Sequence, residues 1–330
     1  MIVDAHGHTL DLAFDAERPL HGDLGGLTDV PLMRAGGVTA QLTACWVPDA
    51  AIGGPHAVDK PLQKALRMLD YLCLQLENEA GHHIVAATCA EDICAANANG
   101  KIALVLGFEG GDSLAGDLGL LRTFHRLGLR HLGLVHEGRN ALGTATQVWE
   151  GSQMRLYDDK IDPPGGLTPA GKAFVGEMNR LGILVDVTHM EEKTFWDALD
   201  VARAPVMATH GNARSLLDNP RNLTDEQIRA IAATGGLVCP SPTPLGPGGG
   251  KPGLEMLLDH IDHMVALIGS DHVGFGTDFL GQTENRPPGF GDIGECGNLV
   301  SGLKRRNHDA DTIAKLMGMN FMRVFSRVAG

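Results

Sequence analysis

The chain has 330 residues, enough for one large α/β barrel or two average domains. Hydrophobic residues make up 43% and charged residues 20% of it, which excludes a largely disordered or low-complexity protein. The formal net charge of −13 repels phosphates, so we expect a small-molecule substrate or metal ions as partners, and neither nucleic acid nor an anionic membrane.

Cysteine usage and the beginning of the chain both predict a cytoplasmic protein. The six cysteines form no CxxC pair, and we expect them to be reduced and buried. Met1 leads directly into an apolar run, without the basic segment and long apolar stretch of a secretory signal. If the chain assembles, base rates favour a homodimer.

Short apolar or β-branched runs alternate with helical stretches along the chain, which is the pattern of parallel βα units. Eight such runs predict strands at residues 2–4, 38–46, 102–108, 131–135, 183–188, 205–209, 237–239 and 273–277. Between them, apolar residues at helical spacing across 62–76 predict a helix that packs one face on the core.

Two later helices have clear boundaries in the sequence. Thr168, a capping residue followed by proline, predicts the start of a helix that ends near Gly182. Thr224 and Gln227 predict a capping box at the start of another helix, which ends at the glycine pair 235–236. The later strands are therefore separated by well-defined helices.

Eight βα units predict an α/β fold, a closed (β/α)8 TIM barrel, as a single domain over residues 1–330. A doubly wound sheet is the alternative, but it usually has fewer strands and a phosphate-binding glycine turn. The run from Gly248 to Pro252 lacks the spacing and the Ser/Thr of a P-loop, and we interpret it as a loop.

Polar side chains follow six of the predicted strands. In a barrel of this kind, catalytic groups lie at the C-terminal ends of the strands. The metal-ligating or acid/base residues at these ends are His6, His8, Glu109, His136, His189, His210 and Asp278. We therefore expect them to meet at one rim of the barrel.

The residue types at this rim predict a metal site. Side chains alternate along a strand, so His6 and His8 point to one face and can bind one cation. With His189, His210 and a carboxylate, the rim has enough donors for two Zn²⁺ or other first-row divalent ions. Glu109 could bridge the two ions, with a hydroxide between them. Such a site hydrolyses polarised carbonyl groups.

Each of these residues also has an ordinary structural interpretation. A lone histidine is more often a hydrogen-bonding group of the core or surface than a ligand. Glu109 could cap a helix, and Arg221, beside the cap at Thr224, could be an ordinary surface arginine. The metal hypothesis is stronger for the four histidines together, because the structural interpretation must explain each strand end separately.

The strand ends and their flanks resemble the renal (membrane) dipeptidase family of metallopeptidases, within the amidohydrolase group of barrels. The similarity runs from residue 4 to residue 325. Its landmarks are 108–111 (Phe-Glu-Gly-Gly), 182–189, 210–222, 222–227 (Asn-Leu-Thr-Asp-Glu-Gln) and 272–278. The spacings agree as well, with 21 residues from His189 to His210 and 11 more to Arg221.

The resemblance implies a set of metal ligands. His6 and Glu109 match ligands of one zinc ion, and Glu109 with His189 and His210 matches the ligands of a second, so that the glutamate bridges both. Position 8 departs from the pattern, because the family has an aspartate where this chain has His8. The site loses a negative charge there, while imidazole still binds zinc.

The resemblance also implies roles for three other residues. His136 matches the histidine that hydrogen-bonds the substrate carbonyl, Arg221 the arginine that binds the free carboxylate of the substrate, and Asp278 the acid that handles protons. Together they imply a zinc dipeptidase that cleaves dipeptides or N-acyl amino acids through a metal-bridging hydroxide.

Two further departures lie beside the expected substrate pocket. Leu280 stands where family members often have an aspartate, and the proline-rich segment 239–245 has no counterpart of a tyrosine that lines the family's pocket. With His8, these changes leave a second hypothesis open, a barrel hydrolase of another small substrate such as a cyclic amide or a lactone. A non-catalytic metal-binding scaffold is the third.

Overall fold

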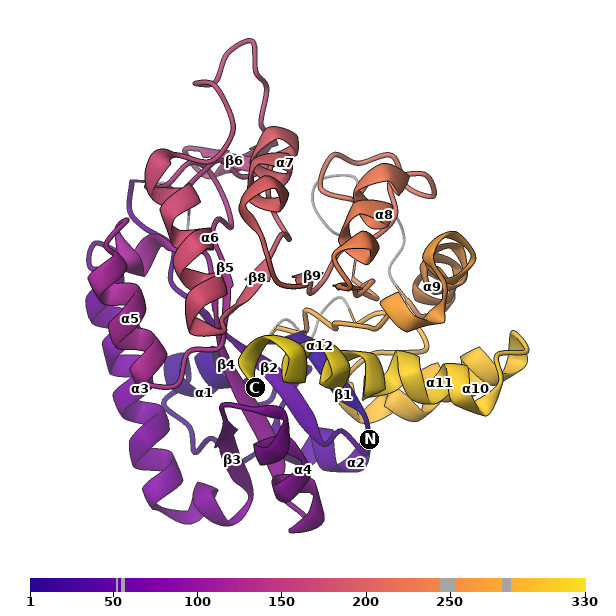
Figure 1. The fold of residues 1–330 in the computed structure, drawn as a ribbon. Coiled ribbons are helices and arrows are strands. Elements are labelled where there is room, and N and C mark those ends of the chain that lie inside the picture. Colours follow the sequence, from indigo (N-terminus) through magenta and orange to yellow (C-terminus); the bar gives the residue numbers. More distant parts are fainter. Residues whose placement is uncertain (52, 55–56, 244–252, 281–285) are drawn as a thin grey trace.

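In the computed structural model, a curled parallel sheet lies at the centre of the protein and helices cover its outside (Figure 1). The structure describes residues 1–51, 53–54, 57–243, 253–280 and 286–330. The run from Gly248 to Pro252 therefore lies outside the described residues, as do Pro244 and Leu245 of the proline-rich segment.

The elements of the described residues follow the expected alternation of strand and helix. The strands are β1 (Val3–Gly7), β2 (Ala40–Trp46), β3 (Ile84–Ala87), β4 (Ile102–Glu109), β5 (His131–Gly133), β6 (Gln147–Glu150), β7 (Gln153–Leu156), β8 (Leu184–Asp186), β9 (Val206–Ala208) and β10 (Leu237–Val238). The α-helices are α1 (Thr9–Asp15), α2 (Val30–Ala35), α3 (Pro61–Glu77), α4 (Ala90–Ala98), α5 (Leu118–Arg126), α6 (Pro169–Leu181), α7 (Glu192–Val201), α8 (Asp225–Ala233), α9 (Leu254–Ile268), α10 (Cys296–Arg305), α11 (Ala310–Ala314) and α12 (Asn320–Ala329).

The sheet runs in the order β1-β2-β4-β5-β8-β9-β10 with parallel pairing throughout, and β3 pairs with the first half of β4. The segment 273–279 lies between the two ends of this path. Gly274 N donates to Val238 O of β10 at 2.9 Å, and Ala5 N of β1 donates to Phe275 O at 3.1 Å. These bonds close the sheet into a barrel and confirm the predicted fold class, although the eighth run makes isolated bridges instead of a continuous strand.

Side-chain alternation along β4 separates two buried layers. Leu104 and Phe108 belong to the outer layer, where the strands pack against helices such as α5. Ala103 and Val105 belong to the inner layer inside the barrel. Because Glu109 continues the inner series at the end of the strand, the alternation points its carboxylate into the mouth of the barrel.

Helix α12 closes the opposite end of the barrel. Its residues Phe321 and Phe325 are buried in the same cluster as Val3 and Leu184, which lie at the beginning of their strands and face inward. The apolar plug fills the N-terminal end of the barrel. The polar groups at the C-terminal ends of the strands thus occupy the other end, where barrel enzymes carry their sites.

The predicted helices are confirmed and one expectation about the cysteines is wrong. Helix α3 covers the expected region, the Thr168 side chain caps α6, and Thr224 with Gln227 forms the capping box of α8. None of the six cysteines is in a disulfide, but Cys73 and Cys94 are exposed, because they lie on the solvent faces of α3 and α4. Among the described residues, no helix is long and apolar enough to span a membrane.

Candidate functional site

Strand register sets the level at which the functional side chains enter the barrel mouth. Trp46 pairs with Glu109, Glu109 with Gly133, and Gly133 with Asp186, so four strands end side by side. Residues that are paired in a parallel sheet point to the same face. Trp46, Glu109 and Asp186 therefore all face the inside of the barrel at one height.

A register shift in β1 brings both predicted histidines of this strand to the inner face. Asp4 pairs with Gln41 on the outer face, but Gly7 pairs with Thr43, so β1 has one extra residue between them. The shift places His6 and His8 on the inside of the barrel, as the H-x-H pattern predicted. Extra residues of this kind are common beside active sites, where they redirect a side chain.

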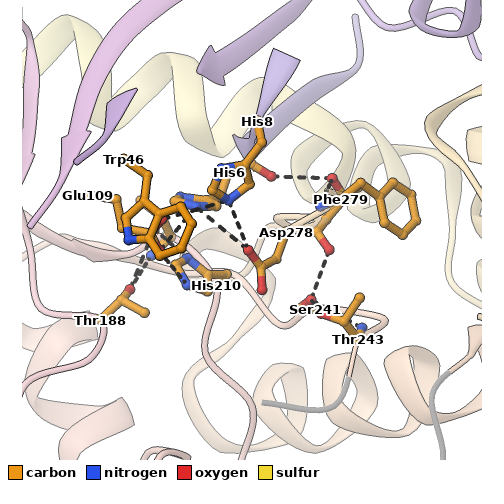
Figure 2. A network of polar contacts seen from close by, with 12 residues as sticks. His6, His8, Trp46, Glu109, Thr188, His210, Ser241, Thr243, Asp278 and Phe279 are labelled. Atoms are coloured by element: carbon orange, nitrogen blue, oxygen red, sulfur yellow. Dashed lines mark hydrogen bonds and ion pairs between the residues drawn. The ribbon is translucent and has the colours of Figure 1, made fainter. Parts of the chain in front are cut away.

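The Glu109 carboxylate is the centre of the site, and Figure 2 shows His6, His210 and Asp278 grouped around it. Its Oε1 atom is surrounded by the Nε2 atoms of four imidazoles, at 3.1 Å for His189, 3.3 Å for His210, 3.4 Å for His6 and 3.6 Å for His136. Its Oε2 atom lies 3.7 Å from His8 Nε2. The structure thus brings together residues from five separate parts of the chain.

Asp278 completes the group on the side of β1. Its Oδ1 atom lies 3.3 Å from His8 Nε2 and 3.8 Å from His6 Nε2, and its backbone N donates to His6 O at 3.0 Å. The ligand atoms of His6, His8, Glu109 and Asp278 lie within 4.8 Å of one another. This acidic residue is therefore a fourth member of the first cluster, in addition to its predicted role with protons.

A second cluster shares the same glutamate. The ligand atoms of Glu109, His189 and His210 also lie within 4.8 Å of one another, and the two histidine Nε2 atoms are 3.0 Å apart. Two clusters joined by one carboxylate match the donor set that two divalent metal ions require. Within the described residues, His6 Nε2 is buried without a hydrogen-bond partner, as expected of an atom that binds a metal.

The charges of the site favour metal binding by the second cluster. Burial would raise the pKa of Glu109, but the surrounding histidines hold it well below its usual range. Burial lowers the pKa of His189 and Arg221 lowers it further, whereas burial and His6 lower the pKa of His210 to about 4. At neutral pH the carboxylate is ionised and these two imidazoles are neutral, which are the forms that bind metal.

The pKa values of His6 and His8 shift upward, opposite to those of His189 and His210. Burial would lower the pKa of both, but Glu109 raises the pKa of His6 and Asp11 raises that of His8 well above the usual value. A metal ion that binds these two nitrogens therefore competes with protons for them. The affinity of the first cluster for metal therefore rises with pH.

Asp186 orients His210 through a hydroxyl group. Thr209 Oγ1 donates to Asp186 Oδ2 at 2.6 Å, so it accepts from His210 Nδ1 at 3.1 Å. This arrangement places the proton of His210 on Nδ1 and leaves the lone pair of Nε2 toward Glu109. His131 Nε2 lies 2.9 Å from the same Asp186 oxygen. Asp186 could not be identified from the sequence, because a single aspartate in a buried strand gives no signal.

His136 faces Glu109 with a defined nitrogen. Trp46 Nε1 donates to His136 Nδ1 at 3.1 Å, so the neutral ring carries its proton on Nε2. Glu137 lies on the same side of the ring, with its Oε2 atom 3.8 Å from Nδ1, and accepts a hydrogen bond from Trp149. The tryptophan at the end of β2 is a second site residue that could not be identified from the sequence.

Arg221 is buried beside the second cluster, with 4% of its surface exposed, so its interpretation as a surface arginine is wrong. Its Nη2 atom donates to His189 Nε2 at 3.0 Å. Both residues line a cavity of about 490 Å³, and Tyr157 and Met190 line it as well. Burial lowers the pKa of Arg221, but an arginine remains charged at neutral pH. A small anionic ligand can therefore bind there.

The departures from the family pattern lie around this mouth. Leu280 is partly buried, and its backbone O accepts from Leu27 N. In the described part of the proline-rich segment, Ser241 Oγ donates to Thr277 O at 3.0 Å. Tyr157, which comes from the segment after β7, lines the cavity and donates its hydroxyl proton to Pro163 O.

Two site residues adopt strained backbone conformations. His189 has a φ of 67° and Asp278 a φ of 54°, in the left-handed region that side chains other than glycine rarely occupy. Such strain costs about 1–3 kcal/mol per residue and persists where the surrounding structure enforces it. Both residues carry side chains that contact the shared clusters, which is a typical setting for strain of this kind.

Several known proteins are similar to this chain. The family model described as membrane dipeptidase (peptidase family M19) matches residues 1–330. An uncharacterized dipeptidase of Schizosaccharomyces pombe is 31% identical over 321 residues, which cover 94% of this chain and 74% of the relative. The crystal structure of a metallo peptidase from Rhodobacter sphaeroides with a phosphinate mimic of the dipeptide L-Ala-D-Ala has a TM-score of 0.85 and 29% identity over 99% of each chain. The dipeptidase AC, a metallo peptidase of family M19, has a TM-score of 0.85 and 30% identity, and the match covers 100% of this chain and 98% of that chain.

Proposed function

The chain belongs to the membrane dipeptidase family (peptidase family M19) and is a hydrolase, and from this premise we propose that it is a dinuclear zinc dipeptidase. Its substrates would be dipeptides, or N-acyl amino acids, with a free C-terminal carboxylate. The observation that carries the proposal is the convergence of four imidazoles on one Glu109 oxygen, beside a buried arginine.

The proposed ligands divide between the two clusters. His6 and His8 would hold one ion, His189 and His210 the other, and Glu109 would bridge them. When bound, two such cations lower the pKa of a water molecule between them and polarise the carbonyl of the substrate. The zinc assignment follows from the nitrogen and oxygen donors, and other first-row divalent ions have similar preferences.

The neighbouring residues supply the other requirements of amide hydrolysis. His136 would donate from its protonated Nε2 to the carbonyl oxygen as negative charge develops there. Asp278 Oδ1, between His6 and His8, would accept the proton of the attacking water and pass it to the leaving amine. The amine can then leave as a neutral group.

Arg221 would select the substrate by its terminal carboxylate. A planar guanidinium binds a carboxylate through two hydrogen bonds, and its burial excludes competing water. Because Arg221 contacts His189 directly, the bound carboxylate would lie a short distance from the metal ions. The substrate could then extend only about one residue beyond the cleaved bond, as in a dipeptide.

A second candidate substrate class is a cyclic amide or lactone, hydrolysed by the same metal site. It is favoured by His8, because an imidazole at this position gives the first cluster less negative charge than a carboxylate would. This alternative does not require a free carboxylate on the substrate. The role of Arg221 therefore distinguishes the two candidates.

The test compares L-Ala-D-Ala, its C-terminal amide, an N-acyl amino acid and a lactone on zinc-reconstituted protein. We expect hydrolysis of the dipeptide and little of the amide. In Arg221→Met, kcat/KM for the dipeptide should fall about 10- to 100-fold, because a charge-assisted hydrogen bond contributes about 1.5–3 kcal/mol. The control Arg203→Met removes an exposed arginine and should retain the parent kcat/KM.

Either of two results would contradict the dipeptidase proposal. One is an Arg221→Met variant that cleaves the dipeptide as efficiently as the parent. The other is a parent protein that hydrolyses the lactone well and the dipeptide poorly, which would select the second candidate.

A further inference from the structure

His8 has a buried acidic partner that faces away from Glu109. The Nδ1 atom of His8 lies 2.8 Å from Asp11 Oδ2, while its Nε2 atom lies toward Glu109 and Asp278. Both members of the pair are buried, with 2% of His8 and 6% of Asp11 exposed. The imidazole thus lies between a carboxylate behind it and the metal-binding cluster in front.

The local fold fixes the geometry of this pair. His8 immediately precedes α1, and Asp11 lies three residues further on, in its first turn. Residues at this spacing in a helical turn lie on the same face, so the two side chains meet. The other oxygen of the carboxylate, Oδ1, accepts at 3.0 Å from Leu12 N, which also donates to His8 O at 3.0 Å, and this contact holds the orientation of Asp11.

Each carboxylate oxygen of Asp11 therefore has a donor. Oδ1 accepts from a backbone N–H that cannot change its role, and Oδ2 is left to accept from His8 Nδ1. The other nitrogen, Nε2, also faces a carboxylate, with Asp278 Oδ1 at 3.3 Å. When Nε2 binds a metal, the proton of the neutral ring is on Nδ1, where Asp11 Oδ2 accepts it at the shorter distance of 2.8 Å. Asp11 thus favours Nε2 as the ligand nitrogen of His8.

Helix capping does not explain the position of His8. Its side chain makes no capping hydrogen bond to α1, although it occupies the N-cap position. Burying two ionisable side chains costs free energy that an apolar pair of similar volume would avoid. The pair is therefore better explained by a role in the metal-binding site than by a contribution to stability.

We propose that Asp11 is a positioning residue for the metal site, which holds His8 with Nδ1 protonated and Nε2 directed at the ion shared with His6 and Glu109. The inference rests on the proposed metal centre. Carboxylates that accept from the distal nitrogen of a ligating histidine fix its ring and increase its basicity, and their loss typically costs 10- to 100-fold in metal affinity.

The experiment measures zinc and Co²⁺ binding to metal-free protein by competition with a chelator, together with the visible spectrum of bound Co²⁺. The test variant is Asp11→Asn, because an amide has one acceptor for the two donors and must present its NH2 to Leu12 N or to His8. We expect one of the two ions to bind about 10- to 100-fold more weakly, with a changed Co²⁺ spectrum.

Two controls separate positioning from a general effect on folding. Asp15→Asn removes an exposed carboxylate from the same helix, where it contacts Lys64, and should bind both ions like the parent. In a His8→Ala background, which lacks the ring that Asp11 would orient, Asp11→Asn should cause no further loss of affinity. Thermal unfolding of each metal-free variant shows that it is folded.

Parent-like binding of both ions by Asp11→Asn would overturn the inference. So would an equal loss of affinity in the presence and absence of His8. These measurements do not involve a substrate. If Asp11→Asn weakens metal binding only when His8 is present, but the parent cleaves no dipeptide, the role of Asp11 is supported and only the proposed substrate is contradicted. If the parent cleaves dipeptides but Asp11→Asn binds both ions like the parent, the substrate is supported and the role of Asp11 is contradicted.

Discussion

The histidines of the site have one residue type but different partners, and these partners set which nitrogen faces the centre. Thr209 and Asp186 hold the proton of His210 on Nδ1. Trp46 donates to Nδ1 of His136 and so holds the proton on Nε2. The His210 ring therefore presents a lone pair suited to a metal, and the His136 ring presents a donor suited to a substrate oxygen.

The variant Trp46→Phe tests this assignment for His136. It removes the indole N–H but retains an aromatic ring, so His136 is free to carry its proton on either nitrogen. We expect kcat for L-Ala-D-Ala to fall about 10-fold or more, with a smaller change in KM, because the hydrogen bond matters most as charge develops. Steady-state kinetics provide the measurement.

The matched control is Trp196→Phe, which changes a tryptophan of α7 that packs against Phe195. It should leave both kinetic constants unchanged. A Trp46→Phe enzyme with parental kcat would show that Trp46 does not set the protonation of His136.

Asp112 gives a pH-dependent prediction for stability. It follows β4, is 6% exposed, and its Oδ1 atom has no hydrogen-bond partner among the described residues. Burial raises the pKa of Asp112 to about 7. Below about pH 4 the group is protonated in both states, whereas between about pH 4 and 7 only the unfolded chain ionises. The free energy of unfolding therefore falls as pH rises through this window.

The variant Asp112→Asn should be more stable than the parent at pH 8, by up to about 4 kcal/mol, because a neutral amide has no charge to desolvate. At pH 4 the two proteins should have similar free energies of unfolding. Urea denaturation across this pH range provides the measurement, with the exposed Asp159→Asn as control. A difference that does not depend on pH would contradict the assignment.

The sequence predicted the roles of the strand-end histidines but not those of the aspartates that orient them. His6, His189 and His210 stand at the ends of apolar runs, so their convergence followed from barrel topology. Asp11 and Asp186 could not be identified, because their partners depend on a helical turn and on strand register. Those contacts appear only when the chain is folded.

At the scale of elements, capping fixes the segment that contains Arg221. The loop before α8 ends at Thr224, whose side chain accepts from Gln227 N while the Gln227 side chain accepts from Thr224 N. Leu223 N also donates to Asn212 O, which ties the loop to the end of β9. The start of the helix thus positions the buried arginine three residues earlier.

Thr224→Ala tests the contribution of this cap. It should lower the free energy of unfolding by about 1 kcal/mol, since the N3 backbone N–H loses its acceptor. Chemical denaturation checks this value. Zinc affinity should be unchanged, because no proposed ligand lies on α8. A variant with parental stability would contradict the assigned role of the capping box.

Periodicity and capping signals located seven strands of the central sheet and the helices α3, α6 and α8 in advance, but three strands of the described residues were missed. Strand β3 and the hairpin of β6 and β7 lie outside the regular βα alternation on which the prediction rested. Their length was not the obstacle, because the predicted strands β5, β8 and β9 have three residues each, fewer than the four of each missed strand. The register shift in β1 was equally invisible, because it depends on pairing with β2.

At the scale of the whole molecule, closure of the barrel creates the site. The segment 273–279 hydrogen-bonds both β10 and β1, and this places Asp278 beside residues from the beginning of the chain. The two proposed metal clusters join strands that are far apart in sequence. Metal ions bound there would stabilise the closed barrel, since a ligand that binds the folded state alone raises its stability.

The shared-carboxylate metal centre can be tested by a zinc titration of the metal-free protein, in which the rate of L-Ala-D-Ala hydrolysis and the bound metal are measured. We predict that activity rises with zinc up to two ions per chain, and that Glu109→Gln, which weakens the shared ligand, loses both activity and at least one ion. Full hydrolysis by the metal-free protein would contradict the shared-carboxylate metal centre. So would a Glu109→Gln variant that is fully active and binds two ions as tightly as the parent.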